Sequence, residues 1–305
     1  MSHQNKPAVA VIGLGSMGMG MACSLLREGF SVAGCDINPA ARAAFAKAGG
    51  AVADTAAGAA SGADIVISVV VNAAQTEQLL TEEAGVINAM AIDGLFVSCA
   101  TMDPAIARRL ADAVEAGGRH YLDAPISGGA VRAAEGALTV MASGSAAAFA
   151  RAEPALDAVA AKVFRLGDAA GQGSAFKMVN QLLAGVHIAV ASEAMVFAAS
   201  QGLDLQQVYE VITASAGNSW MFENRMPHVI AGDYSPASAI DIFVKDLGIV
   251  DDMARSARMP TPIAAAALHM YLAASGMGMG RDDDSSVARV YATLGNQTLP
   301  GGKNR

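Results

Sequence analysis

Short apolar runs alternate with helix-compatible stretches through the first half of the chain. The runs are rich in Val, Ile and Ala, and glycine- or proline-containing turns separate them. The predicted strands are residues 8–12, 31–35, 64–71, 95–99, 138–142 and 162–166, and the predicted helices are residues 19–28, 39–48, 103–116 and 145–160. Strands that alternate with helices form a parallel sheet covered on both faces. We therefore predict a doubly wound α/β domain over residues 1–168.

After residue 168 every apolar pattern is helical. Glycines stand at 171 and 173, and no proline follows until after residue 200, which predicts one helix about 45 Å long at 1.5 Å per residue. A helix of this length suits a spine that joins two domains. Further helices are predicted over residues 205–214, 220–230, 240–257, 263–274 and 285–294. The acidic run 282–284 is interpreted as the cap of the last helix. We predict an all-α domain over residues 169–305 that binds the substrate and mediates oligomerisation.

Composition narrows the class of partner. Hydrophobic residues make up 53% of the 305 residues and charged residues 16%, which is enough apolar surface for two cores. The net charge of −8 disfavours nucleic acid and anionic membranes. Cys23, Cys35 and Cys99 are too few and too widely spaced for a disulfide framework or a metal site. The apolar run at 8–12 is too short for a signal sequence, so we expect a cytoplasmic protein. Because the cysteines are not spaced for a metal site, we also expect no metal.

A glycine-rich turn follows the first predicted strand and opens the first helix. In Gly13-Leu-Gly-Ser-Met-Gly18, the first glycine permits a tight turn, Gly15 lets backbone approach a pyrophosphate, and Gly18 lets helix and strand pack closely. The helix N-terminus offers N–H groups to phosphates. Asp36 ends the next strand, where its carboxylate would accept bonds from ribose hydroxyls and repel a 2′-phosphate. The pattern predicts a Rossmann-like domain that binds NAD rather than NADP; as an alternative, Asp36 caps the following helix.

Lys177 is isolated in an apolar segment. It is the only formally charged residue between Asp168 and Glu193, and Asn180 and Gln181 share its helix face. Such a polar face inside apolar surroundings indicates a wet site within the protein. Burial lowers the pKa of a lysine and lets it exchange a proton near neutrality. The residues alone leave open whether Lys177 is catalytic or an ordinary solvated helix lysine.

Four motifs in order then resemble the β-hydroxyacid (3-hydroxyisobutyrate dehydrogenase-like) family. They are the turn at 13–18, Asp-Ala-Pro-Ile-Ser-Gly-Gly at 123–129, Gly-x-Gly-x-x-x-Lys-x-x-Asn at 171–180, and Phe-Val-Lys-Asp-Leu at 243–247. The resemblance covers nearly the whole chain. It implies a hydride transfer between NAD and a small hydroxy acid, without a metal, and an assembly of two or four identical subunits.

The resemblance also implies a role for each matching position. Lys177 becomes the acid/base, Ser127, Gly128 and Gly129 bind the substrate carboxylate, and Asn180 holds Lys177 or the substrate. The implied cofactor contacts are Gly13, Leu14, Gly15, Ser16, Met17, Gly18, Asp36, Val70, Val71, Thr101 and Lys245. Lys245 has an alternative role as an ion-pair partner of Asp241. Trp220 either lines the substrate pocket or is a core aromatic.

Several shorter stretches resemble the L-threonate dehydrogenases within this family. They include Val-Asn-Ala-Ala-Gln at 71–75 and Ala-Gly-Asn-Ser-Trp-Met-Phe-Glu-Asn-Arg at 216–225. This resemblance implies oxidation of L-threonate at C2 to the 2-oxo acid. Alternatives within the family are oxidation of 3-hydroxyisobutyrate and reduction of tartronate semialdehyde. An alternative of another class is a cofactor-binding scaffold without catalysis, which the presence of Lys177, Asn180 and Ser127 disfavours.

Overall fold

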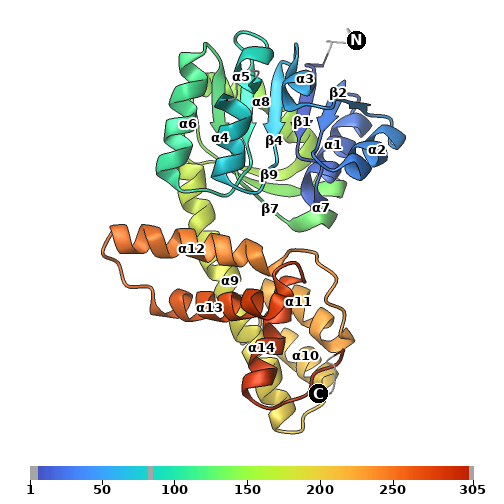
Figure 1. Cartoon of the computed structure of the whole chain (residues 1–305), viewed down its shortest axis with the longest axis vertical. Helices are drawn as coiled ribbons and strands as arrows, with labels where there is room; N and C mark the ends of the chain where they lie inside the picture. The colour runs from blue at the N-terminus through green and yellow to red at the C-terminus, as the bar shows by residue number, and fades with distance from the viewer. Residues whose placement is uncertain (1–5, 82–84, 302–305) are drawn as a thin grey trace. The chain divides into compact units, whose positions relative to one another are not determined.

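A computed structural model describes residues 6–81 and 85–301 and divides into two compact units, Met1–Lys177 and Met178–Arg305 (Figure 1). The division falls inside the long helix, nine residues after the predicted domain boundary. That boundary, drawn after residue 168 from the change of pattern, stays a prediction.

A six-stranded parallel sheet forms the centre of the first unit. Its strands are β1 (Val9–Ile12), β2 (Val32–Cys35), β3 (Ala51–Val52), β4 (Ile65–Ser68), β5 (Leu95–Ser98) and β6 (His120–Asp123). They lie in the order β3-β2-β1-β4-β5-β6, and each neighbouring pair is parallel. The order reverses direction between β1 and β4, which is where doubly wound sheets bind nucleotides. The predicted doubly wound fold is confirmed.

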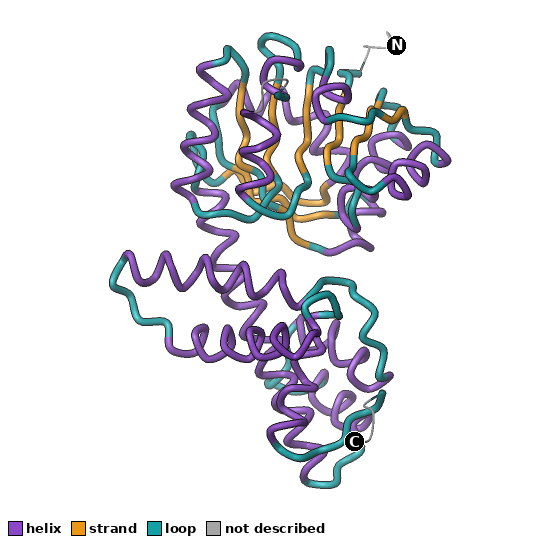
Figure 2. Tube along the Cα trace, in the orientation of Figure 1, coloured by secondary structure: helices purple, strands orange, loops and turns teal. Residues whose placement is uncertain are grey.

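Helices cover both faces of this sheet (Figure 2). The helices of the unit are α1 (Ser16–Arg27), α2 (Pro39–Lys47), α3 (Ala56–Ala60), α4 (Ala73–Thr81), α5 (Val86–Ala89), α6 (Pro104–Ala116), α7 (Gly129–Glu135) and α8 (Ala146–Val159). Successive residues of β1 point to opposite faces of the sheet and pack in different hydrophobic cores. Val9 and Val11 pack in the core that contains α1 and α8. Ala10 and Ile12 pack in the core that contains α3 and α6. Strands buried on both faces read as continuous apolar runs, which is why the sequence predicted them.

A second, three-stranded sheet belongs to the same unit. In it β7 (Ile126–Ser127) pairs antiparallel with β8 (Leu138–Ala142), which pairs parallel with β9 (Ala160–Arg165). The sequence predicted β8 and β9 but not β3, β6 or β7. The strands β3 and β7 have two residues each, so their side chains show no periodicity to detect.

The described residues of the second unit form helices and loops. Its helices are α9 (Gln172–Ser200, which begins in the first unit), α10 (Leu205–Thr213), α11 (Trp220–Ala231), α12 (Ile240–Ser256), α13 (Pro262–Ala274) and α14 (Val287–Leu294), with short helical turns η1 (Ser275–Met279) and η2 (Asp284–Ser286). The all-α prediction is confirmed. The 29 residues of α9 span about 44 Å.

Among the described residues, α9 alone is long and apolar enough to cross a membrane, with a mean hydropathy of 1.8 over its most apolar window. Half of that window is buried inside the structure. Central helices of soluble proteins meet the same criterion, so this helix is weak evidence for a membrane span.

Candidate functional site

The carboxyl ends of five strands form one row across the large sheet. Cys35 pairs with Ile12, Ile12 with Ser68, Ser68 with Ser98, and Ser98 with Asp123. Because the strands are parallel, the loops that follow them leave the sheet at the same edge. The predicted site residues that follow these strand ends are Gly13, Asp36, Val70, Val71, Thr101 and Ser127–Gly129.

The glycine-rich turn has the close approaches that its pattern predicted. Gly13 has φ +94°, and a Cβ there would lie 2.7 Å from the carbonyl oxygen of Val69. A Cβ at Gly18 would lie 1.8 Å from the Gly13 oxygen, so neither position accepts a side chain. Gly15, the residue that precedes α1, has open space where its Cβ would be. This turn therefore fits a pyrophosphate group lying against backbone.

The remaining residues of the turn differ in exposure. Leu14 is buried in the core, Ser16 is exposed, and Met17 is partly buried, the last two lying in the first turn of α1.

Asp36 is fixed in a hydrogen-bonded turn. Its Oδ2 accepts the N–H of Leu14 at 2.6 Å, and its Oδ1 accepts the N–H of Asn38 at 2.7 Å. Each carboxylate oxygen has two lone pairs, so each can accept a further bond from a ribose hydroxyl. The cap of α2 is Asn38, whose side chain accepts the N–H of Ala40, so the alternative role of Asp36 as that cap is wrong. Arg42 donates to the carbonyl oxygen of Asp36 at 2.6 Å.

The Ser-Gly-Gly motif joins β7 to α7. Gly128 has φ +139° and Gly129 has φ +75°, conformations that glycine adopts readily and other residues rarely do. A Cβ at Gly129 would meet nothing within 4 Å, whereas Ser127 and Gly128 are partly buried. The two consecutive glycines thus form a turn into α7 that other residues would not readily adopt.

Close packing of α7 on α1 brings the two glycine motifs into one region. A Cβ at Gly20 would lie 2.6 Å from the backbone nitrogen of Ala134, and Ser24 Oγ lies 3.2 Å from the carbonyl oxygen of Ala133. Sequence reasoning missed both positions. Small residues four apart on one helix face, Gly20 and Ser24, were the available signal.

Lys177 lies near the start of α9 and is buried, with 7% of its surface exposed. Its Nζ donates a hydrogen bond to the carbonyl oxygen of Ile126 at 2.8 Å. Ile126 directly precedes Ser127, so the lysine head lies one residue from the start of the Ser-Gly-Gly motif.

A buried carboxylate that sequence reasoning had not assigned also lies here. Asp123 ends β6 and is 1% exposed. Burial raises the pKa of its carboxyl group, and hydrogen bonds from Ser174, Gly171 and Ser143 partly offset that rise. Its place as the first residue of the motif at 123–129 was the signal that could have identified it.

Two site residues predicted in the second unit belong to one polar network. Asn180 donates to the Gln181 side-chain oxygen at 2.9 Å, Gln181 donates to Asp246 at 2.5 Å, and Lys245 pairs with the other oxygen of Asp246. Lys245 thus pairs with its neighbour Asp246, and the alternative pairing with Asp241 stays a prediction. Asp246 is 1% exposed, so the network has a buried anchor.

Trp220 does not join this network and is not a buried core aromatic. It begins α11 and is 49% exposed, so the alternative that placed it in the core is wrong. Its place in a substrate pocket stays a prediction.

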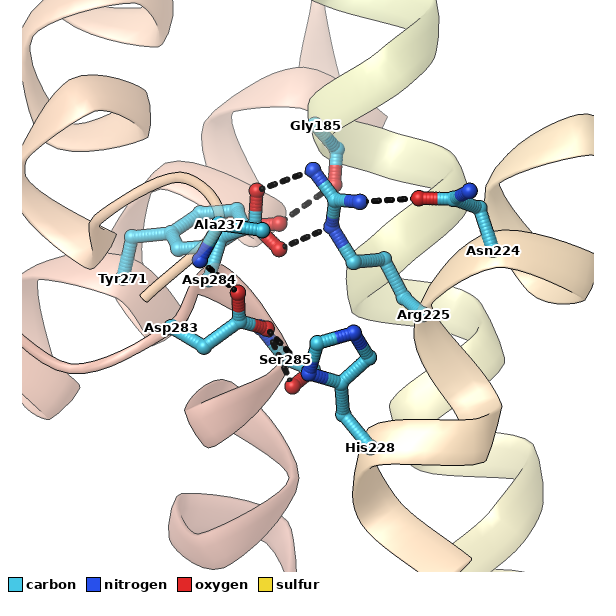
Figure 3. Close-up of polar contacts among 9 residues, drawn as sticks. All are labelled: Gly185, Asn224, Arg225, His228, Ala237, Tyr271, Asp283, Asp284 and Ser285. Atoms are coloured by element: carbon cyan, nitrogen blue, oxygen red, sulfur yellow. Dashed lines mark hydrogen bonds and ion pairs between the residues drawn. The ribbon is translucent and has the colours of Figure 1, made fainter. Parts of the chain in front are cut away.

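The acidic run at 282–284 caps the turn that leads into α14 and also forms ion pairs. Asp283 caps the short turn η2 by accepting the Ser285 N–H at 3.1 Å. Asp284, 0% exposed, instead forms a two-point ion pair with Arg225 of α11, at 2.6 and 3.2 Å (Figure 3). Tyr271 lies beside the pair and donates to the carbonyl oxygen of Gly185 at 2.9 Å. This cluster ties α9, α11, α13 and η2 together.

No group of three or more His, Cys, Asp or Glu side chains placed to hold a metal ion occurs within residues 6–81 and 85–301.

Known protein families match both parts of the chain. Residues 8–167 match the NAD binding domain of 6-phosphogluconate dehydrogenase, and residues 171–291 match the NAD-binding domain of NADP-dependent 3-hydroxyisobutyrate dehydrogenase. The chain is 50% identical to L-threonate dehydrogenase of Cupriavidus necator over 96% of this chain and 98% of the relative. It is 49% identical to L-threonate dehydrogenase of Escherichia coli K12, over 97% of each.

Solved structures agree on the fold. A crystal structure of 3-hydroxyisobutyrate dehydrogenase from Salmonella typhimurium has a TM-score of 0.89 and 51% identity to this chain, and the match covers 93% of this chain and 99% of that one.

Proposed function

The chain belongs to the 3-hydroxyisobutyrate dehydrogenase-like family of NAD-binding dehydrogenases, and from this premise we propose that it oxidises L-threonate at C2 to the 2-oxo acid. The observation that carries the choice of substrate is the near-full-length identity of 46–50% to several L-threonate dehydrogenases. The burial of Lys177 beside the Ser-Gly-Gly motif supports the chemistry.

The cofactor would lie along the carboxyl edge of the sheet. We assign the pyrophosphate to the backbone at 13–18, where Gly15 leaves open space, and the ribose to Asp36. Val70, Val71, Thr101 and Lys245 are the further proposed contacts. When bound, NAD supplies the acceptor for the hydride from C2.

The protein's own groups bind the substrate and move one proton. The Ser127 hydroxyl and the N–H groups of Gly128 and Gly129 bind the carboxylate. Neutral Lys177 accepts the proton of the C2 hydroxyl at Nζ, and the carbonyl oxygen of Ile126 orients the amine by accepting one of its N–H groups. The ammonium so formed keeps this hydrogen bond, which is stronger to a charged donor. Asn180 holds the lysine or the substrate, and Trp220 lines the pocket.

We also propose a cytoplasmic homodimer or homotetramer. Exposed apolar side chains recur along α9 at helical spacing: Phe176, Val179, Leu183, Val190 and Phe197. A stripe of this kind on one helix is typical of a face that another subunit covers. Light scattering after size exclusion tests this assignment, and a monomer at micromolar concentration would contradict it.

The test of function is a panel of small hydroxy acids with NAD and NADP, followed by absorbance of the reduced cofactor. We expect L-threonate to have the highest kcat/KM and NAD to be preferred because of Asp36. Lys177→Ala should lower kcat by about 100-fold or more, whereas the surface variant Lys162→Ala should not change it. Equal use of NADP would contradict the proposed role of Asp36 in selecting NAD. An active Lys177→Ala enzyme would contradict the proposed role of Lys177 as the base.

Oxidation of 3-hydroxyisobutyrate is the second candidate function. It is favoured by the 51% identity to the Salmonella crystal structure of that name. The same panel separates the two candidates, because a higher kcat/KM for 3-hydroxyisobutyrate than for L-threonate would decide for the second.

A further inference from the structure

The Asp123 carboxylate collects hydrogen bonds from the start of α9. Its Oδ2 accepts the backbone N–H groups of Gly171 and Ser174, both at 2.9 Å. Its Oδ1 accepts the Ser174 hydroxyl at 2.7 Å. The hydroxyl of Ser143 also donates to Oδ2, at 3.3 Å, and accepts the Gly173 N–H at 2.9 Å. The first turn of a helix lacks intrahelical acceptors for its N–H groups, and here Asp123 and Ser143 supply them.

Two hydrogen bonds connect the same two segments of the chain. Asp123 is hydrogen-bonded to Ser174, and three residues further along each segment the carbonyl oxygen of Ile126 is hydrogen-bonded to Lys177. Both links join positions 51 residues apart. The loop from β6 to the Ser-Gly-Gly motif is therefore held in register with the first turns of α9.

Close packing leaves this helix start no room to shift. A Cβ at Gly173 would lie 2.3 Å from the carbonyl oxygen of Met141 and 2.8 Å from that of Asp123. Gly171 has φ +105°, which lets the chain turn into the helix directly beside the carboxylate. The N-terminus of α9 thus lies directly on the ends of β6 and β8.

We propose that Asp123 is the positioning residue for Lys177: its buried carboxylate fixes the first turn of α9 against the 123–129 loop and so sets where Nζ stands relative to Ser127–Gly129. The proposal rests on the acid/base role proposed for Lys177. Asp123 does not exchange a proton with the substrate in this proposal, since four donors occupy its two oxygens. It acts through the helix that carries the lysine.

The informative variant is Asp123→Asn, which keeps the shape of the side chain. An asparagine replaces one acceptor oxygen by an NH2 donor, and that group would face either the Gly171 and Ser174 N–H groups or the Ser174 hydroxyl. Ser174→Ala is the milder variant, because it removes one hydrogen bond and keeps the carboxylate. Asp64→Asn is the matched control: Asp64 also accepts a backbone N–H, that of Ala8 at 2.9 Å, but directly precedes β4 at the opposite edge of the sheet.

The experiment measures kcat, KM, the pH profile of kcat and the dissociation constant of NAD for these variants and for Lys177→Ala. For Asp123→Asn we expect kcat to fall by about 100-fold, the cost of displacing a catalytic group by about 1 Å. The NAD dissociation constant should stay within about twofold, because Asp123 lies outside the glycine-rich turn. The pH profile should lose its wild-type shape and converge on that of Lys177→Ala. Ser174→Ala should lower kcat by about 10-fold, and Asp64→Asn should not change it.

Two results would overturn the inference. One is a kcat for Asp123→Asn or Ser174→Ala within about twofold of the wild type. The other is a lower kcat with an unchanged pH profile, which is what a smaller folded fraction produces. If Asp123→Asn fails to fold, Ser174→Ala decides by the same readouts. An inactive Lys177→Ala beside a fully active Asp123→Asn contradicts this inference alone, whereas an active Lys177→Ala contradicts the proposed base itself.

Discussion

Removing Arg225 from the buried cluster of the second unit should destabilise the protein in a strongly pH-dependent way. In Arg225→Met the Asp284 carboxylate loses both hydrogen bonds of its ion pair while remaining 0% exposed. Breaking a buried pair from one side costs about 3–5 kcal/mol, because an uncompensated charge remains. We expect a loss of this size in the free energy of unfolding at pH 8.

The sign of the pH dependence follows from the pKa of Asp284. Burial raises this pKa from 3.8 to about 6, although Arg225 acts to lower it. The folded state therefore binds the proton more tightly than the unfolded chain does. Protonation of Asp284 stabilises the folded state fully below pH 4, and this stabilisation is lost as the pH rises through 6. At neutral pH the buried, ionised carboxylate therefore lowers the free energy of unfolding by about 3 kcal/mol, at 1.36 kcal/mol per pH unit.

Loss of Arg225 raises the pKa of Asp284 further, so the variant takes up a proton at a higher pH than the wild type. The destabilisation by Arg225→Met should therefore shrink by up to about 1.4 kcal/mol per pH unit as the pH falls from 8 towards 6. Well below pH 6 both proteins are protonated at this site, and the difference should become constant.

Urea unfolding at pH 8, 7, 6 and 5 measures this effect. The single tryptophan, Trp220, begins the helix that carries Arg225, so its fluorescence reports on this unit, and circular dichroism reports on the whole chain. The double variant Arg225→Met/Asp284→Leu is the control, because it removes the buried charge and should recover most of the loss. A destabilisation below about 1 kcal/mol at pH 8, or one that is equal at pH 8 and pH 6, would refute this reasoning.

Three further predictions follow from packing and burial. Gly20→Ala should destabilise the protein by about 1–2 kcal/mol, since overpacking against α7 outweighs the gain in helix propensity. Gly248→Ala lies in an open part of α12 and should stabilise the protein by up to about 1 kcal/mol. Equal shifts of the two variants in thermal unfolding would contradict this prediction. Tyr271→Phe should cost about 1 kcal/mol in urea unfolding by removing the bond to α9, and an unchanged midpoint would show that bond to be unimportant. Burial raises the pKa of Cys99 to about 12, so iodoacetamide at pH 8 should leave this thiol unmodified in the folded protein and modify it in urea; rapid labelling without urea would contradict its burial.

The long elements could be read from the sequence because local patterns determine them. The apolar runs of β1, β4 and β5 are continuous since both faces of the sheet are covered. The lack of proline between Gly173 and Ser200 predicted α9 to within a residue or two. Strand β6 was missed because polar or charged residues, His120 and Asp123, stand at both of its ends.

The candidate site also contains residues that local patterns predicted and residues that they did not. Its glycines could be predicted because a positive φ or a close approach excludes other residues at Gly13 and Gly18. Asp246 could not be assigned, because its partner Gln181 lies 65 residues away on another helix. Pairings of this kind depend on which helices pack together, and a single sequence carries no record of that.

The sequence by itself determined the parallel sheet, the helical second half and the glycine-rich turn, because backbone preference and side-chain periodicity act over a few neighbouring residues. It also showed Lys177 as an isolated charge, but only the family resemblance implied its role as the base. The tertiary structure alone decided how buried charges are satisfied. It bonds Asp123 to Ser174 and Asp284 to Arg225, across 51 and 59 residues. A buried charge must find its partner wherever folding places one, because leaving it unpaired costs several kcal/mol, about the net stability of a small domain.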